Sequence, residues 1–207
     1  MLKIQSKFDL VLGSQSPRRK ELLKWIYIPY KVIVSEIDEV STKNNVEDLV
    51  MDLASQKAQV VFDKASKLYE NPFVISADTI VVVDGELLGK PDSLTDAKTM
   101  LQKLAGRSHD VLTGVTFKSS QINFSFFDKT QVHFDEVHDS LLDLYLETKE
   151  SMDKAGSYGI QGAALGFINK INGSYSNVVG LPVNLVLKNM KNILKLNEKE
   201  LRDAFND

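Results

Sequence analysis

The sequence contains no cysteine, and this absence removes three kinds of chemistry. A chain without cysteine has no disulfide framework, no thiol nucleophile and no thiolate ligand for a metal. Its three histidines, His109, His133 and His138, lack the spacing of a zinc hydrolase, so we interpret them as ordinary surface or strand residues. With 11 glycines and 5 prolines in 207 residues, the chain is neither collagen-like nor dominated by low-complexity sequence.

Long apolar runs are also missing. No segment approaches the about 18 uninterrupted apolar residues of a membrane-spanning helix, and the residues before Gly13 hold no apolar core of signal-peptide length. The 25 basic and 28 acidic residues give a formal net charge of −3, which argues against a general nucleic-acid-binding surface. We therefore expect a soluble intracellular protein without a membrane segment, folded as one domain or as one domain with two lobes.

Alternating strands and helices predict the fold class. Apolar or alternating runs predict strands over residues 8–13, 30–35, 73–83, 86–89, 109–118, 122–134 and 167–171. Amphipathic spacing and cap residues predict helices over residues 17–26, 46–69, 95–104, 140–148 and 183–196. We expect the glycine-rich segment 156–166 to be a loop and the polar tail 197–207 to fray. This order is typical of an α/β fold in which a mixed sheet is flanked by helices.

The segment Ser14-Gln-Ser-Pro-Arg-Arg19 joins the end of a predicted strand to the start of a predicted helix. Ser16 is expected to cap the helix and Pro17 to occupy its first position. Arg18 and Arg19 then lie in the first turn, where the helix dipole disfavours cations. A phosphate bound by the backbone N–H groups and the guanidinium groups explains this pattern. The alternative is that both arginines point to solvent or pair with nearby acids.

Two charged residues interrupt apolar patterns. Lys57 falls within the apolar stripe of the helix predicted over 46–69, so it must reach solvent, pair with a carboxylate or bind an anion. Replacing Lys57 with alanine is then expected to stabilise the free protein slightly. Asp78 interrupts the apolar strand predicted over 73–83, where an unpaired carboxylate is costly. Asp78 is therefore expected to bind a metal, pair with a lysine or lie at a strand end that faces a cleft.

Glu36 and Gln161 complete the candidate residues. Glu36 ends a predicted strand, and two carboxylates at strand ends suit magnesium-assisted chemistry on a phosphate. Taken alone, Glu36 has the pattern of a solvated loop acid. Gln161 lies in a segment rich in backbone donors, and its amide can both donate to and accept from the edge of a base. By composition alone, that segment is a flexible loop.

Seven segments resemble, in the same order, the Maf-like family of nucleotide pyrophosphatases. They cover residues 10–196 and comprise residues 14–19, Glu36 in a Glu-Ile-Asp context, Lys57-Ala58, Ala77-Asp-Thr79, Lys90-Pro91, residues 153–162 and Ile171-Asn-Gly-Ser-Tyr-Ser-Asn-Val-Val-Gly-Leu-Pro182. The resemblance implies a single domain over 1–207, similar to inosine triphosphate pyrophosphatases, with two lobes around an active-site cleft. It also implies a cytoplasmic enzyme, often a homodimer, that uses Mg²⁺ or Mn²⁺ to split a nucleoside triphosphate into the monophosphate and pyrophosphate.

The resemblance also implies a role for each matching residue. The catalytic residues it implies are Asp78, Glu36, Lys57 and Lys90, and the phosphate-binding residues are Ser14, Arg18 and Arg19. Glu36 and Asp78 hold the metal, and Asp78 serves as metal ligand, as the base that activates water, or as both. The residues that match the subgroup preferring dTTP and UTP are Arg18, Thr79 and Gln161. One departure is Gly13, where the family commonly has alanine.

Three alternatives remain beside this function. The first is a pyrophosphatase of the same family that prefers 7-methyl-GTP. The second is a non-catalytic nucleotide-binding regulator of septum formation, which would not need the acids at positions 36 and 78. The third is a nucleic-acid-binding module, which predicts a basic surface with stacking aromatic residues. The formal charge of −3 and the aromatic residues within apolar strand patterns disfavour this third alternative.

Overall fold

The computed structural model describes residues 8–205, which form two compact units. The first unit comprises the chain up to Asp78, Gly114–Phe127 and the chain from Gly180 onward, and the second comprises Thr79–Thr113 and Asp128–Val179. Three long strands supply residues to both units: β3 (Pro72–Val83), β5 (Ser108–Lys118) and β6 (Asn123–Phe134). The chain thus has the two lobes expected from the sequence, and its treatment as a single domain stays a prediction.

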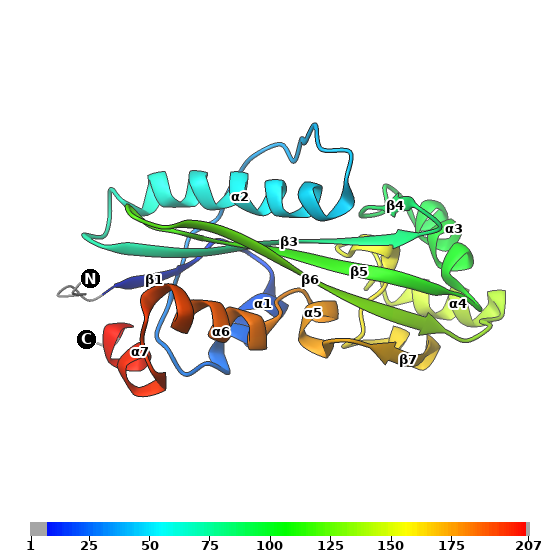
Figure 1. The fold of residues 1–207 in the computed structure, drawn as a ribbon. Coiled ribbons are helices and arrows are strands. Elements are labelled where there is room, and N and C mark those ends of the chain that lie inside the picture. Colours follow the sequence, from blue (N-terminus) through cyan, green and yellow to red (C-terminus); the bar gives the residue numbers. More distant parts are fainter. Residues whose placement is uncertain (1–7, 206–207) are drawn as a thin grey trace. The chain divides into compact units, whose positions relative to one another are not determined.

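In the first unit, β1 (Asp9–Leu12) lies between β2 (Lys31–Val32) and β3 and runs parallel to both. The strand order there is β2-β1-β3-β5-β6. The helices of this unit are α1 (Pro17–Lys24), α2 (Val46–Ala65), α6 (Val183–Leu194) and α7 (Glu198–Phe205). Figure 1 shows α2 on one face of these strands, with α1 and α6 on the other face.

Helix α2 packs closely on the strands because of what lies beneath it. Its start is fixed by Asn45, whose Oδ1 accepts a hydrogen bond from the backbone N–H of Asp48 at 3.0 Å. A Cβ on Gly114 of β5 would lie only 2.3 Å from the carbonyl oxygen of Val50, so only glycine allows this approach. The apolar contacts below α2 form a small core of Val11, Ala58, Val61, Ala65 and Val74.

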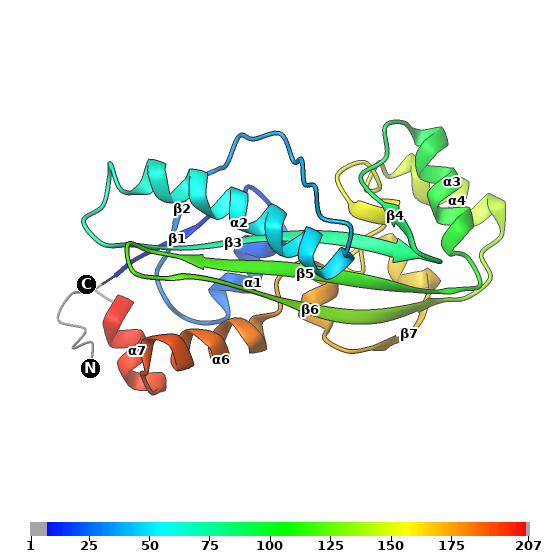
Figure 2. The same cartoon turned by 45° about the horizontal axis from the view of Figure 1, so that its top comes forward.

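In the second unit, a turn at Asp84-Gly85 leads into β4 (Glu86–Leu88), which pairs antiparallel with β3. Both turn residues have positive φ, 50° and 81°, as the predicted tight hairpin requires. Strand β7 (Ile168–Asn172) pairs antiparallel with β6. The helices are α3 (Leu94–Leu104), α4 (Asp139–Glu147), the 3₁₀ turns η1 (Ala155–Ser157) and η2 (Ala163–Phe167), and α5 (Tyr175–Val179). Parallel and antiparallel pairings together confirm the predicted mixed sheet with flanking helices (Figure 2).

The prediction of a frayed tail was wrong, because residues 198–205 form α7. Asn197 and Glu200 cap this helix reciprocally: Asn197 Oδ1 accepts from the Glu200 backbone N–H at 3.0 Å, and Glu200 Oε2 accepts from the Asn197 N–H at 2.8 Å. Leu201 and Phe205 are buried, and the Phe205 ring lies 5.5 Å from the ring of Phe73 in β3. Two apolar residues one turn apart therefore anchor a segment whose average composition is polar.

Other elements differ in extent from the sequence prediction. The strand expected over 30–35 shortens to β2, whose two residues are exposed beside β1. The long helix ends at Ala65 and not at residue 69. The glycine-rich loop contains η1 and η2, and the five residues of α5 gave too short a pattern to be predicted. Within residues 8–205, no helix is both long and apolar enough to cross a membrane.

Candidate functional site

The N-terminal end of α1 holds the predicted phosphate-binding residues. Ser16 caps the helix as expected, since its Oγ accepts a hydrogen bond from the Arg19 backbone N–H at 3.4 Å. Ser14 is buried, and its Oγ accepts from the Ser16 backbone N–H at 3.2 Å and from Arg19 Nη1 at 3.5 Å. Arg19 Nε donates to the carbonyl of Gly180 at 2.8 Å. These bonds hold the Arg19 guanidinium at the start of the helix, next to the partly buried Arg18.

The Arg19 guanidinium is partly buried. Burial lowers the pKa of the Arg19 guanidinium. The neighbouring carboxylate of Asp78 opposes this shift, the charge of Arg18 adds to it, and the carboxylate of Glu39 opposes it. Arg19 therefore lies within electrostatic reach of the acidic side chains described next.

A buried ion pair joins α2 to β3. Lys57 Nζ donates to Asp78 Oδ1 at 2.6 Å and lies 2.7 Å from Oε1 of Glu39. The side chains of Lys57 and Asp78 are only 11% and 9% exposed, whereas that of Glu39 is 44% exposed. This confirms the expectations that Lys57 pairs with a carboxylate and that Asp78 pairs with a lysine. Removal of either partner would leave the other charge buried.

Glu36 lies in a different setting from Asp78. Its carboxylate is 84% exposed and lies 3.5 Å from Nζ of Lys64, which also donates to the Val34 carbonyl at 3.0 Å. The acid that reaches Lys57 is instead Glu39, three residues further along. The sequence shows both acids in one short segment but gives no signal for which of them turns toward α2.

The acidic residues have the donor chemistry of a site for a hard cation. Carboxylate oxygens are the ligands that Mg²⁺ prefers, and Mg²⁺ usually takes only one or two of them, together with water and phosphate oxygens. Across the part of the chain that the structure describes, no group of three or more His, Asp or Glu side chains is placed to hold a metal ion. The predicted pair, Glu36 and Asp78, has this donor chemistry, although Glu36 pairs with Lys64 and Asp78 with Lys57.

Gly13 departs from the family's common alanine for a local steric reason. Its backbone N–H donates to the Ile75 carbonyl at 2.8 Å, which fixes the chain against β3. A Cβ at this position would lie 2.1 Å from Oγ of Ser76 and 3.1 Å from a methyl group of Val61. A side chain at position 13 would therefore require the Ser76 hydroxyl to rotate away and the Val61 methyl group to shift slightly.

The second unit holds the other predicted site residues. Thr79 Oγ1 lies 3.0 Å from Oγ1 of Thr113 on the neighbouring strand β5. Lys90 is exposed just after β4, and Gln161 is exposed between η1 and η2. The backbone N–H of Gly156 donates to the Gly89 carbonyl at 3.0 Å, so the glycine-rich loop lies against the segment that carries Lys90.

A buried histidine anchors the same loop. His109 Nε2 lies 2.7 Å from the hydroxyl of Tyr158, three residues before Gln161. Burial lowers the pKa of His109 to about 4, and burial also raises the pKa of Tyr158. Both groups are therefore neutral at pH 7. The sequence interpretation of His109 as an ordinary strand residue was right about the strand but missed this contact.

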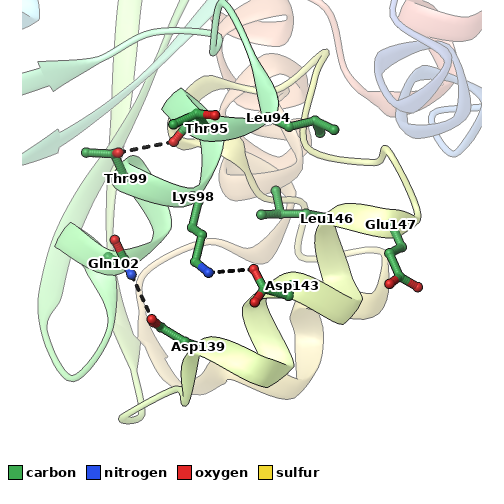
Figure 3. Close-up of a pocket in the computed structure, with 9 residues that line it drawn as sticks. All are labelled: Leu94, Thr95, Lys98, Thr99, Gln102, Asp139, Asp143, Leu146 and Glu147. Atoms are coloured by element: carbon green, nitrogen blue, oxygen red, sulfur yellow. Dashed lines mark hydrogen bonds and ion pairs between the residues drawn. The ribbon is translucent and has the colours of Figure 1, made fainter.

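A pocket of about 560 Å³ lies between α3 and α4 (Figure 3). Lys98 Nζ donates to Asp143 Oδ1 at 2.6 Å, and Gln102 Nε2 donates to Asp139 Oδ1 at 2.9 Å. None of the sequence-predicted site residues lines this pocket. Because it contains none of the predicted residues, it is not the candidate site.

Known proteins resemble this chain over most of its length. It is 44% identical over 182 residues to a protein of Bacillus cytotoxicus named dTTP/UTP pyrophosphatase, covering 87% of this chain and 93% of that protein. It is 43% identical over 183 residues to a protein of the same name from Bacillus cereus, covering 88% and 94%. The fold resembles that of a HAM1 protein from Coxiella burnetii, with a TM-score of 0.53 at 12% identity over 91% of this chain and 98% of that one.

The segments that carry the sequence resemblance also fall within one family model. The model described as Maf-like protein matches residues 9–193, which include every predicted site residue. At this coverage, the chain belongs to the Maf-like protein family.

Proposed function

We propose that this chain hydrolyses dTTP and UTP to the nucleoside monophosphate and pyrophosphate, by attack of water on the α-phosphorus. The observation that carries the proposal is the buried Lys57–Asp78 pair, within electrostatic reach of Arg19. A carboxylate can accept the proton of the attacking water, and neighbouring cations stabilise the charge on the phosphates. The relatives at 44% and 43% identity are named dTTP/UTP pyrophosphatases, which supports the substrate class.

The cationic residues act on the phosphates. The N-terminus of α1 presents backbone N–H groups and the positive end of its dipole, which favour an anion. Arg19 is held there by Gly180 and Ser14, so its guanidinium is already oriented before substrate binds. In this proposal, Lys90 helps Arg19 to compensate the negative charge of the leaving pyrophosphate. Fixed cations stabilise the charge that develops on the leaving group, because they need no reorganisation during the reaction.

Asp78 is the proposed proton acceptor for the attacking water. Lys57 binds its Oδ1 at 2.6 Å and thereby orients the carboxylate, with Oδ2 as the atom that takes the proton. Glu36 and Asp78 are the residues that would hold a divalent cation. Such a cation supplies positive charge at the phosphate oxygens when it is bound.

Arg18, Thr79 and Gln161 are proposed to select the base. Uracil and thymine share an edge of alternating acceptor, donor and acceptor atoms, whereas cytosine has a donor where uracil has an acceptor. Arg18 can donate to one carbonyl, and the Gln161 amide can donate to the other. A 7-methylguanine ring carries a positive charge, which Arg18 would repel. The family resemblance also supports a cytoplasmic homodimer, as part of the same proposal.

Hydrolysis in ¹⁸O-labelled water tests the bond that is attacked. The chain is incubated with UTP and Mg²⁺ in labelled water, and the products are resolved by mass spectrometry. The proposal predicts one ¹⁸O atom in UMP and none in pyrophosphate, with no reaction in excess chelator. Label in pyrophosphate, or release of inorganic phosphate in place of pyrophosphate, would contradict it.

A further inference from the structure

A second pocket lies in the first unit and contains none of the predicted site residues. It has a volume of about 440 Å³ and is lined by the residues that follow α1 and by residues of α6 and α7. Helices α6 and α7 lie next to each other in both views (Figure 1 and Figure 2). A pocket of this volume accommodates a small organic ligand.

An exposed tryptophan and buried apolar side chains line this pocket. Trp25 is the only tryptophan in the sequence, and it is 67% exposed. Ile26, Ile28 and Leu201 are each at most 6% exposed and supply the apolar surface. An exposed indole offers a flat face on which an aromatic ring can stack. The pocket is therefore suited to a planar ligand.

The backbone around Trp25 is held by the hydrogen bonds of a tight turn. The N–H groups of Trp25 and Ile26 donate to the carbonyls of Leu22 and Leu23, both at 3.2 Å. Tyr27 ends this turn with a φ of 54°, in the left-handed region that bulky residues rarely adopt. Since burial of Ile26 also anchors the turn, a ligand that stacks on Trp25 does not have to order this segment.

The charged side chains of the pocket are mainly basic. They are three cations, Lys188, Lys191 and Arg202, and one carboxylate, Glu198. Lys191 donates to Glu198, so these two charges compensate each other. Within residues 8–205, no acidic side chain pairs with Lys188 or Arg202, although the chain as a whole has a formal charge of −3. Two uncompensated cations in the same pocket as an indole favour a ligand that carries both a ring and an anionic group.

Two amides complete the polar lining of the pocket. The side chains of Asn184 and Asn192 are exposed and form no hydrogen bond with another residue of the part that the structure describes. An amide both donates and accepts, and the edge of a nucleobase presents donors and acceptors in the same way. A phosphate group suits Arg202, because a guanidinium can bind it through two parallel N–H groups.

We propose that this pocket is a second ligand site, which binds a nucleotide with its base on Trp25 and its phosphate at Lys188 and Arg202. The inference goes beyond the proposed function, because no residue assigned to hydrolysis lines the pocket. Stacking on an indole tolerates any base, so the site takes purine as well as pyrimidine nucleotides. AMP is a suitable probe, because the proposed catalytic site selects uracil and thymine and because AMP has no bond that a pyrophosphatase cleaves.

Fluorescence of the single tryptophan reports directly on the pocket. Addition of AMP to the full chain is expected to quench Trp25 in a saturable manner with a Kd below about 1 mM, after correction for absorption by AMP. Adenosine lacks the phosphate and ribose 5-phosphate lacks the ring. In competition with AMP, each is expected to have a Kd at least about tenfold higher than that of AMP. The absence of a saturable change up to about 10 mM AMP, or adenosine binding as tightly as AMP, would overturn the inference.

A double variant, Lys188→Gln with Arg202→Gln, separates the pocket from the catalytic site. Its Kd for AMP is expected to rise at least about tenfold, while its kcat/KM for UTP stays within about twofold of the wild-type value. The matched control is Lys195→Gln with Lys199→Gln, which removes the same charge from exposed positions outside the pocket. The control is expected to retain the wild-type Kd. Equal weakening in both double variants, or none in the first, would overturn the inference.

A second copy of the chain seated on the pocket is the competing explanation for the exposed Trp25. It predicts that Trp25 fluorescence changes with the concentration of the chain, and that AMP does not reverse this change. That result would overturn the nucleotide site. Failure of the proposed function has a different signature, namely no release of pyrophosphate from UTP or dTTP by the wild-type chain, and the AMP titration does not depend on it.

Discussion

The Lys57–Asp78 pair allows a prediction opposite to the one that the sequence suggests. The sequence places Lys57 in an apolar stripe, and on that basis its removal is expected to stabilise the protein. In the structure, however, Lys57 Nζ lies 2.6 Å from Asp78 and both side chains are about nine-tenths buried. Lys57→Met fills the same volume but leaves the Asp78 carboxylate buried without this cation. Loss of one partner of a buried pair costs about 3–5 kcal/mol of unfolding free energy.

This loss can be measured by urea unfolding followed by circular dichroism. In thermal unfolding of a chain of this size, a loss of about 3–5 kcal/mol corresponds to a decrease in Tm of roughly 6–20 °C. The lower part of that range is expected, because the charge of Arg19 also acts on Asp78. Lys64→Met is the matched control on the same helix. Lys64 is 42% exposed and pairs with the exposed Glu36, so its loss is expected to cost less than about 1 kcal/mol.

A double-mutant cycle with Asp78→Asn isolates the pair. The loss of unfolding free energy in the double variant is expected to be about 1–3 kcal/mol smaller than the sum of the losses in the two single variants. Strictly additive effects would refute the argument. So would a Lys57→Met variant whose stability lies within about 0.5 kcal/mol of the wild type.

Three further predictions follow from other contacts. Asp78→Asn is expected to lower kcat for pyrophosphate release from UTP by about 10²-fold or more, and retention of full turnover would contradict its role as base. The pKa of His109 is about 4 in the folded chain and 6.5 in the unfolded chain. Between these pH values only the unfolded chain binds the proton, so the free energy of unfolding should fall by about 3 kcal/mol as the pH is lowered from 6.5 to 4. His109→Gln should therefore weaken the pH dependence of the urea midpoint, and an unchanged slope would argue against a buried neutral imidazole. Phe205→Ala should cost about 3–5 kcal/mol, whereas a cost near zero would show that α7 is not anchored.

Local pattern was enough to predict several features of the site. Ser16 and Pro17 marked the start of α1, and both charged residues that broke apolar patterns, Lys57 and Asp78, proved to be partners. A charge inside an apolar stripe must be compensated, so the sequence itself signals that a partner exists. Alternating strands and helices likewise predicted the mixed sheet.

Contacts between distant segments were not predictable in the same way. The choice of Glu39 over Glu36 as the partner of Lys57 depends on how a loop after β2 folds back over α2. The Thr113 contact to Thr79 spans 34 residues, and nothing in either local sequence points to the other. Helix α7 was missed because its average composition is polar, although its cap residues and two buried side chains gave a readable signal.

The most direct test of the proposed function is the set of kcat/KM values for dTTP, UTP, CTP and 7-methyl-GTP, measured by pyrophosphate release with Mg²⁺. We expect dTTP and UTP to be the best substrates and their kcat/KM values to differ by roughly tenfold or less, because a 5-methyl group is weakly discriminated. The kcat/KM values for CTP and for 7-methyl-GTP should both be lower by about tenfold or more. CTP leaves a polar group unpaired, and 7-methyl-GTP places a positive charge near Arg18. A chain that uses CTP or 7-methyl-GTP best, or that releases no pyrophosphate from any of the four, would contradict the proposed function.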